Sequence, residues 1–286
     1  MKLQVYQHFL NMKYSESFII KNLDNKLFIR SWTPEFPPKK NILVVHGLGE
    51  HSGRYKNFAK IFVKNGFGVF ALDLIGHGKS FGKKGHLKKF VNNLDSIEAS
   101  LIYIRKKYLN TPIILFGHSL GGLVSLKFLI DRESKEIDKS IISSPWIETA
   151  IKIPSYLLLI HKVLHKIFPS LQLHNNLVTK HLSKDKNVID DYENDPLVHD
   201  RISLNLFSEI IKTIDNVIKK SSRIKLETLL YHGENDKIIS HKGTKKIASL
   251  IPNNKFILFE DIYHEPHNDN EKDLVFKQMI EFINKQ

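Results

Sequence analysis

Residues 117–121 read Gly-His-Ser-Leu-Gly and place a serine where the chain must turn sharply. The apolar run 113–116 precedes this motif and the apolar segment 122–130 follows it, so the context is strand, turn and helix. The glycines on either side of Ser119 leave room for a tight turn that lifts its hydroxyl clear of the sheet, at the positive end of a helix dipole. This pattern indicates a nucleophilic serine, and a purely structural turn is the alternative.

A serine hydroxyl is a poor nucleophile without an oriented base, and the order serine, acid, histidine is typical of this motif. Asp236 lies in a loop after the apolar run 228–232, and His264 lies in a loop after the run 256–259. Each residue thus follows a predicted strand in the expected order. Ser119, Asp236 and His264 form the predicted catalytic triad.

Two other acids compete for the role of Asp236. Glu234 lies two residues nearer to the strand end, and Asp261 is too close to His264 in sequence to orient it easily. The segment 264–267, His-Glu-Pro-His, is similar to a zinc-binding helix but lacks histidines four residues apart and contains a proline. We therefore keep Asp236 as the predicted acid and predict no metal site.

Acyl transfer also needs donors for the oxyanion that forms on the attacked carbonyl. The apolar run 42–45 ends in His-Gly-Leu-Gly, residues 46–49, a turn that can point a backbone N–H inward. The N–H groups of Leu48 and of Leu120, the residue after the serine, are the predicted oxyanion hole. One such donor typically contributes about 2.7–4 kcal/mol of transition-state stabilisation.

These residues require a scaffold that brings several strand ends to one edge of a sheet. Short apolar runs bounded by Gly, Pro or polar residues are typical of strands buried on both faces. They occupy residues 42–45, 67–72, 113–116, 140–142, 228–232 and 256–259. Apolar residues spaced three and four apart predict helices within 94–108 and 274–282. The alternation predicts a doubly wound, mostly parallel α/β sheet, with an antiparallel hairpin at residues 18–29.

The alternation is interrupted once, after Pro145. The chain is lipophilic there and then acidic, with no strand predicted before residue 228. We predict an insertion of residues 145–205 at the carboxyl edge of the sheet, where such folds bind ligands. The predicted hydrolytic core then consists of residues 1–144 and 206–286.

Composition excludes several classes of protein. The 286 residues are 42% hydrophobic and include no cysteine, which excludes a disulfide framework and a cysteine nucleophile. The net charge is +13, but the lysines are scattered, which argues against a nucleic-acid binder. Residues 1–17 lack the pattern of a secretion signal, and no apolar run reaches the ~20 residues of a membrane span. We expect a soluble, cytoplasmic protein.

Taken together, these motifs resemble the monoacylglycerol lipase and lysophospholipase-like branch of the α/β-hydrolase superfamily. The resemblance extends with correct spacing from about Leu27 to the C-terminus. It rests on residues 46–55 (His-Gly-Leu-Gly-Glu-His-Ser-Gly-Arg-Tyr), 73–80 (Asp-Leu-Ile-Gly-His-Gly-Lys-Ser), 117–122, 191–197 (Asp-Tyr-Glu-Asn-Asp-Pro-Leu) and the Asp236/His264 pair. It implies an α/β-hydrolase fold with a helical cap insertion, ester hydrolysis and no cofactor.

The resemblance also implies a small polar pocket for the glycerol part of the substrate. The matching positions are Glu50, Arg54, Tyr192 and His267. The alternatives are a buried ion pair for Glu50 and Arg54, a core aromatic for Tyr192 and a surface position for His267. The sequence departs from the family at residues 265–266, where Glu-Pro replaces an apolar pair.

Residues 155–168 give the insertion its own expected role. Nine of these fourteen residues are apolar, and the basic and histidine side chains among them fall in one stripe. So wide an apolar arc exceeds what packing on one side can bury. We expect Leu158, Leu159 and Val163 to line an acyl-chain tunnel or contact lipid, which would make the protein peripheral at a membrane. A helix packed only in the core is the alternative.

The sequence therefore predicts a serine ester hydrolase that releases a fatty acid from monoacylglycerol through an acyl-enzyme on Ser119. A lysophospholipase, to which the +13 charge lends support, or a broad short-chain carboxylesterase would use the same chemistry. From another class, the chain could be an inactive lipid-binding protein on this fold. A lipid substrate is the expected partner in each case.

Overall fold

The computed structural model of the chain describes residues 12–22, 25–132 and 135–285. An eight-stranded sheet has the order β1-β2-β4-β3-β5-β6-β9-β10. Its strands are β1 (Lys13–Asn22), β2 (Asn25–Thr33), β3 (Asn41–Val45), β4 (Gly68–Leu72), β5 (Ile113–His118), β6 (Lys139–Ser143), β9 (Thr228–Gly233) and β10 (Asn254–Phe259). Neighbours from β4 to β10 run parallel, whereas β1 and β2 form an antiparallel hairpin and β2 is antiparallel to β4. The mostly parallel sheet and the hairpin confirm the sequence prediction. Residues 1–11 of the segment predicted to lack a secretion signal lie outside the described residues.

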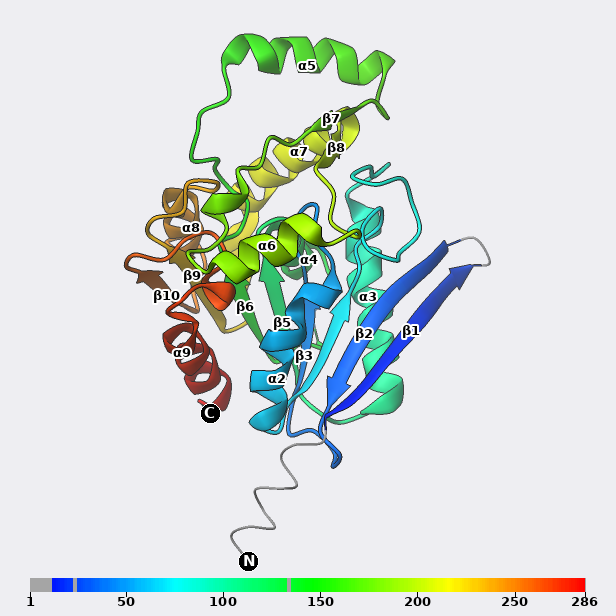
Figure 1. Cartoon of the computed structure of the whole chain (residues 1–286), viewed down its shortest axis with the longest axis vertical. Helices are drawn as coiled ribbons and strands as arrows, with labels where there is room; N and C mark the ends of the chain where they lie inside the picture. The colour runs from blue at the N-terminus through cyan, green and yellow to red at the C-terminus, as the bar shows by residue number, and fades with distance from the viewer. Residues whose placement is uncertain (1–11, 23–24, 133–134, 286) are drawn as a thin grey trace, which may run out of the picture.

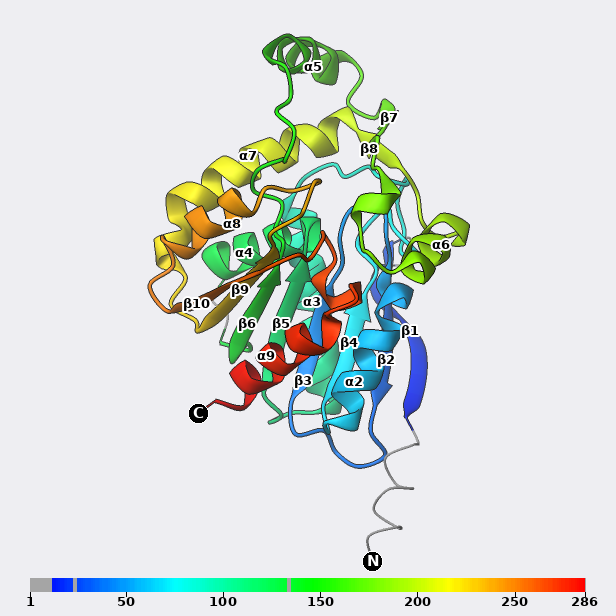
Figure 2. The same ribbon diagram turned by 60° about the vertical axis from the view of Figure 1, so that its left-hand side comes forward.

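Alternate residues along each strand point to opposite faces of the sheet. In β3, Leu43 and Val45 join one hydrophobic core, and Ile42 and Val44 join the other. The first face is covered by α3 (Val91–Lys107), α4 (Leu120–Asp131), α7 (Leu204–Lys220) and α8 (His241–Ala248). The second face is covered by α2 (Lys56–Lys64) and α9 (Lys272–Asn284) (Figure 2). Helices on both faces confirm the doubly wound architecture.

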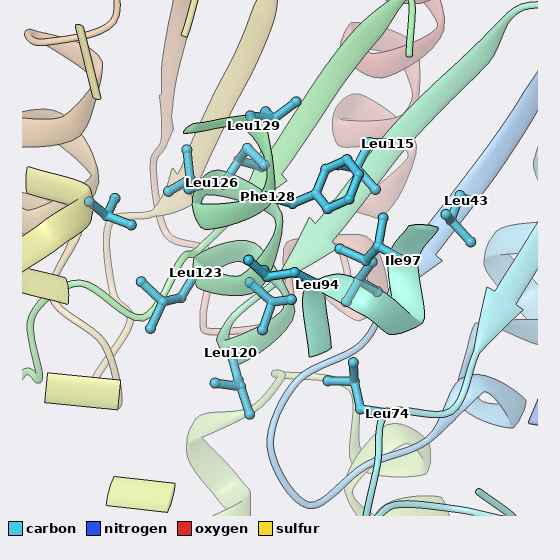
Figure 3. Close-up of a cluster of buried hydrophobic side chains, with 14 of the residues drawn as sticks. Leu43, Leu74, Leu94, Ile97, Leu115, Leu120, Leu123, Leu126, Phe128 and Leu129 are labelled. Carbon is cyan, nitrogen blue, oxygen red and sulfur yellow. The ribbon is translucent and has the colours of Figure 1, made fainter. Parts of the chain in front are cut away.

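The predicted spacing of α3 is confirmed by its packing. Leu94, Ile97, Leu101 and Ile104 are buried against the sheet and α4. Figure 3 shows Leu94 beside the leucines of α4, among them Leu120. Each fully buried leucine or isoleucine contributes about 1.5–3 kcal/mol by leaving water. This core holds the start of α4 in place beneath the candidate site.

The segment between β6 and β9 leaves the sheet at its carboxyl edge. It contains α5 (Ser155–Ile167), β7 (Gln172–His174), η2 (Thr179–His181), α6 (Lys186–Asn194), β8 (Arg201–Ser203), α7 and η3 (Ser221–Arg223). β7 and β8 pair antiparallel as a second, two-stranded sheet. The prediction that no strand lies between Pro145 and residue 228 is therefore wrong, because three-residue strands are too short to show an alternating pattern.

Helix α5 stands apart from the rest of the chain at the top of Figure 1, and none of its residues is buried. It packs against α7, where His161 Nε2 lies 2.8 Å from Ser208 Oγ and the His161 ring meets Phe207 edge-on. Large apolar side chains such as Tyr156 and Ile167 remain more than half exposed on α5. Within the described ranges, no helix is both long and apolar enough to cross a membrane.

Candidate active site

Ser119 occupies the sharp turn between β5 and α4. Its backbone has φ 52° and ψ −116°, a conformation that costs a residue with a side chain about 1–3 kcal/mol. Ser119 N donates to Ser143 O at 3.0 Å, and Trp146 N donates to Ser119 O at 3.0 Å. A Cβ on Gly121 would lie 2.0 Å from Val45 O, so only glycine fits there. The motif's glycine and these hydrogen bonds together hold the strained turn.

Asp236 lies in the loop after β9 and is surrounded by hydrogen-bond donors. Its Oδ2 accepts from His264 Nδ1 at 2.6 Å and from His232 Nε2 at 2.9 Å. Its Oδ1 accepts from the amides of Ile238 and Ile239 at 2.8 and 2.9 Å. Burial alone would raise the pKa of Asp236, but the charge of His264 and these bonds hold it well below its usual value. Asp236 is therefore a carboxylate whose four acceptor positions are all used.

His264 lies in the loop after β10 and is buried. Because Nδ1 donates to Asp236, Nε2 is the ring nitrogen able to take a proton. Burial lowers the pKa of His264, but the Asp236 carboxylate outweighs this effect and raises that pKa above its ordinary value. The backbone amides of His264 and Glu265 donate to the carbonyls of His181 and Leu182 at 3.4 and 2.8 Å. The segment between β6 and β9 thus ties down the histidine loop.

The two rival acids lie away from the imidazole. Glu234 is exposed. Asp261 is exposed too, and its carboxylate binds Lys184 Nζ and Asn235 Nδ2, both at 2.9 Å. Of the three acids considered from the sequence, Asp236 is the one that contacts His264.

Two elements meet beside the serine hydroxyl. Gly47, after β3, lies so close to Ser119 that an added Cβ would be 3.2 Å from the serine Cβ, and Gly47 N donates to Glu50 Oε1 at 2.6 Å. Leu48 lines the same cavity as Ser119. Leu120 is the first residue of α4, where amides have no partner within the helix. The loop that carries Leu48 and the helix that starts at Leu120 therefore converge on Ser119.

A cavity of about 640 Å³ is lined by both Ser119 and His264 and extends toward α5. Leu158 of α5 lines it, in keeping with the sequence expectation. Leu159 and Val163, which were expected to share this role, are not among its lining residues and are 65% and 56% exposed. Adjacent helical residues point about 100° apart, so the apolar arc of α5 cannot face the cavity throughout.

The cavity also has polar lining residues beside Ser119 and His264. Glu50, Glu265 and Tyr192 line it. Arg54 pairs with both Glu265 oxygens at 2.7 and 2.8 Å and with Glu50 Oε2 at 2.8 Å, and its guanidinium lies 4.7 Å from the Tyr192 ring centre. Burial would raise the pKa of Glu265, but Arg54 lowers it to about 2. Arg54, expected in the pocket, is not among its lining residues, because its guanidinium faces the two carboxylates behind it.

His267 was also expected in this pocket, but the structure buries it in the core. A proline starts the short helix η4 (Pro266–Asn268), and this turn leaves His267 2% exposed. Its ring stacks on Tyr55 at 5.3 Å and meets His118 edge-on at 4.9 Å. Burial lowers the pKa of His267 to about 4, so this ring is neutral near pH 7. Glu265 takes the position that faces the cavity.

Comparison with known proteins agrees with this geometry. The family described as serine aminopeptidase, S33 (Hydrolase_4) matches residues 37–271. The chain belongs to this hydrolase family. Its fold is the α/β-hydrolase fold, and it is a hydrolase.

Three relatives of this hydrolase illustrate the match. Monoglyceride lipase of Rattus norvegicus is 30% identical over 91% of the chain and 86% of its own length. The crystal structure of monoacylglycerol lipase from Paleococcus ferrophilus is 31% identical with a TM-score of 0.79, over 96% of this chain and 98% of that one. An uncharacterized abhydrolase domain-containing protein of Dictyostelium discoideum is 30% identical over 95% of the chain, which spans 29% of that protein's length.

Two buried residues beside the site of this hydrolase were not predicted from its sequence. Glu265 lines the cavity next to His264, and its only sequence signal was the departure from an apolar pair. The ring of His232 contacts Asp236. Its only sequence signal was a histidine at the end of a predicted strand, four residues before the acid. Glu265 depends on Arg54, 211 residues away along the chain, whereas the partners of His232 lie within its own strand-end region.

Proposed function

We propose that this hydrolase is a serine esterase that releases a fatty acid from monoacylglycerol through an acyl-enzyme on Ser119. One feature carries the proposal: a single cavity is lined by Ser119 and His264, by apolar side chains of α5 and by two carboxylates, Glu50 and Glu265. A single acyl chain joined to a small polyol fits both kinds of lining. The names of the rat and Paleococcus relatives, monoglyceride lipase and monoacylglycerol lipase, support the same substrate class.

In the proposed acylation step, Ser119 Oγ attacks the ester carbonyl carbon while His264 Nε2 takes the hydroxyl proton. Asp236 orients the imidazole and stabilises the imidazolium that forms. The amides of Leu48 and Leu120 donate to the oxyanion of the tetrahedral intermediate. The carbon–oxygen bond to glycerol then breaks, and the glycerol oxygen leaves with the proton from His264.

Deacylation repeats these roles with water as the nucleophile. His264 removes a proton from water, the hydroxide attacks the acyl carbonyl, and the oxyanion is bound by the same two amides. Collapse of the intermediate returns the proton to Ser119 and releases the fatty acid. The ester, one water molecule and the groups of this chain together account for every atom and proton in the two steps.

Among the polar lining residues, we assign recognition of the glycerol hydroxyls to Glu50, Glu265 and Tyr192. Carboxylate oxygens accept hydrogen bonds from hydroxyl groups, and a charged acceptor makes these bonds about twice as strong as neutral ones. Arg54 supports this pocket from behind by pairing with both carboxylates, and its charge keeps Glu265 ionised. Its role is thus indirect, unlike the direct contact expected from the sequence.

Residues 145–205 act, in this proposal, as the cap over the triad. Leu158 contributes to the acyl-chain wall, whereas Leu159 and Val163 belong to the outer arc of α5, which we assign to a lipid surface. An amphipathic helix of this kind lies in the membrane interface, and nearby lysines such as Lys162 add attraction to anionic lipid. The protein would then be peripheral at the membrane that contains its substrate.

A side-by-side panel of monoacylglycerol, lysophosphatidylcholine and triacylglycerol tests the proposal. We expect the highest kcat/KM for monoacylglycerol, because two further acyl chains or a bulky headgroup would not fit beside the carboxylates. A preference for lysophosphatidylcholine would make the protein a lysophospholipase. Absence of hydrolysis of every ester, including a soluble p-nitrophenyl ester, would contradict the proposed function and favour a lipid-binding protein.

A further inference from the structure

His232, near the end of β9, contacts the acid of the proposed triad. It is fully buried, and its Nε2 lies 2.9 Å from Asp236 Oδ2 and 3.1 Å from Ile239 O. Its other ring nitrogen, Nδ1, lies 2.7 Å from Thr244 Oγ1 on α8. A chain of three contacts therefore runs from Thr244 through His232 and Asp236 to His264.

The partners of His232 fix its tautomer. Both partners of Nε2, a carboxylate and a carbonyl, are acceptors only, so Nε2 carries the proton. Nδ1 of the neutral ring is then an acceptor, and the Thr244 hydroxyl donates to it. Burial lowers the pKa of His232, in keeping with a neutral ring. His232 thus behaves as a fixed neutral N–H donor aimed at Asp236.

This donor changes what Asp236 can do for His264. The two imidazoles share one carboxylate oxygen, at 2.6 Å for His264 and 2.9 Å for His232. A hydrogen bond to a carboxylate spreads its charge and makes it less basic. His232 therefore restrains the carboxylate's position and weakens its pull on the proton of the catalytic imidazole.

We propose that His232, with its ring held in place by Thr244, is a positioning residue that fixes Asp236 and sets how strongly Asp236 stabilises protonated His264. The effect on catalysis rests on the proposed function, whereas the effect of His232 on the titration of His264 does not depend on it. The groups that face the Asp236–His264 pair from the surrounding elements are Glu50, Arg54, His118, His181, His232, Lys237, His241, Glu265 and His267. Apart from His232, none of these groups donates a hydrogen bond to Asp236 within the described residues.

The sign of the effect follows from the role of His264. His264 must be neutral to act as a base, so kcat/KM falls as the pH drops through its pKa. Without the His232 donor, Asp236 becomes more basic and stabilises the imidazolium more strongly. The pKa of His264 and the acid limb of kcat/KM should then move to higher pH, by about half a unit to one unit.

Three variants separate a role of His232 in the titration of His264 from a purely structural role: His232→Leu, Thr244→Val and His232→Gln. Leucine removes the donor, and valine removes the hydroxyl that holds the imidazole ring in place, which weakens the donor. Glutamine places an amide nitrogen near the position of Nε2 and can restore the donor. Thr228→Val is the matched control, because the Thr228 hydroxyl is buried on the same strand, 2.8 Å from Ser140 Oγ, away from Asp236.

The pKa of His264 is measured by NMR titration of its ring, assigned with His264→Ala, and the acid limb is measured with p-nitrophenyl acetate. We expect an upward shift for His232→Leu and Thr244→Val, and wild-type values for His232→Gln and Thr228→Val. The inference would be overturned if Thr244→Val and His232→Leu lowered only the thermal stability and left the pKa of His264 unchanged. If His232→Leu does not fold, Thr244→Val, which is close to isosteric, decides alone. Loss of the proposed function would show as absent ester hydrolysis in the wild type, while the NMR titration still reports on His232.

Discussion

The loops that follow β5, β9 and β10 differ from helix α5 in burial and in hydrogen bonding. Ser119, Asp236 and His264 are 7%, 7% and 4% exposed, and each is held by several hydrogen bonds. Helix α5 buries none of its residues and is tied to α7 through His161. Both regions nevertheless line the same cavity.

This difference separates two tasks in one site. Bond making requires atoms held within a fraction of an ångström, which the buried loops provide. Holding a flexible acyl chain requires apolar area rather than fixed atoms, which exposed leucines on a loosely held helix provide. Changes in the loops should therefore affect every ester, whereas changes in α5 should affect long chains only.

The largest effect is expected for Ser119→Ala. Because the triad acts as a unit, turnover should fall by about 10⁶-fold for acetyl and long-chain esters alike. Ser125→Ala, at a buried serine on α4, the helix that follows Ser119, is the matched control and should retain turnover. The measurement is kcat on both substrates. If Ser119→Ala lost activity on one ester and kept it on the other, the proposal that the buried loops act on every ester would be wrong.

Asp236→Asn should have the next largest effect. The amide favours the wrong imidazole tautomer, so kcat should drop by about 10⁴-fold while the protein stays folded. Asp261→Asn serves as the control, because Asp261 binds Lys184 and Asn235 at the surface. If Asp261→Asn proved the more damaging variant in the same assay, the assignment of the acid would be wrong.

The sequence predicted the core and its loops better than the segment above them. Ser119, Asp236 and His264 could be predicted because each follows a buried apolar strand, and parallel strands must end at one edge. The Glu265–Arg54 pair could not be predicted, because its partners are 211 residues apart and meet only in the folded chain. The proline that turns His267 into the core was visible, but its direction depends on packing against Tyr55.

The insertion was predicted from its composition and from the break in the strand–helix alternation after Pro145. Strands β7 and β8 have three residues each, which leaves no period to detect. The wide apolar arc of α5 was visible in the sequence. The sequence did not show which part of the arc faces the cavity, because this depends on how α5 packs on α7. Leu158 faces the cavity and Leu159 does not.

The buried loops and α5 should also differ in how much a substitution changes the free energy of unfolding. Glu265→Ala should lower the free energy of unfolding by about 3–5 kcal/mol, because it removes one carboxylate from a buried charged group and leaves Arg54 only partly compensated. Leu159→Ser on α5 should change it by less than about 0.5 kcal/mol, as exposed substitutions do. Urea denaturation of both variants tests this, and a large loss for Leu159→Ser would mean that α5 belongs to the core.

The smallest expected effect is confined to long-chain substrates. Leu158→Ser should reduce kcat/KM for long-chain monoacylglycerol by about 10-fold, since each CH₂ kept from water contributes about 0.8 kcal/mol. Hydrolysis of a soluble acetyl ester should be unchanged. Leu159→Ser is the matched neighbour: it should keep both activities in detergent and instead weaken binding to anionic vesicles. Equal losses for both substrates in Leu158→Ser would contradict a chain-binding role.

The most direct test is the rate and the site of covalent labelling by a short and a long alkyl fluorophosphonate, followed by mass spectrometry. We predict that both reagents label Ser119 of the wild type, and that the long reagent reacts faster. Leu158→Ser should reduce the advantage of the long reagent and leave the short one unchanged, while Ser119→Ala should abolish both. Labelling at another residue, or wild-type rates that do not depend on chain length, would contradict a fixed serine site served by an apolar cap.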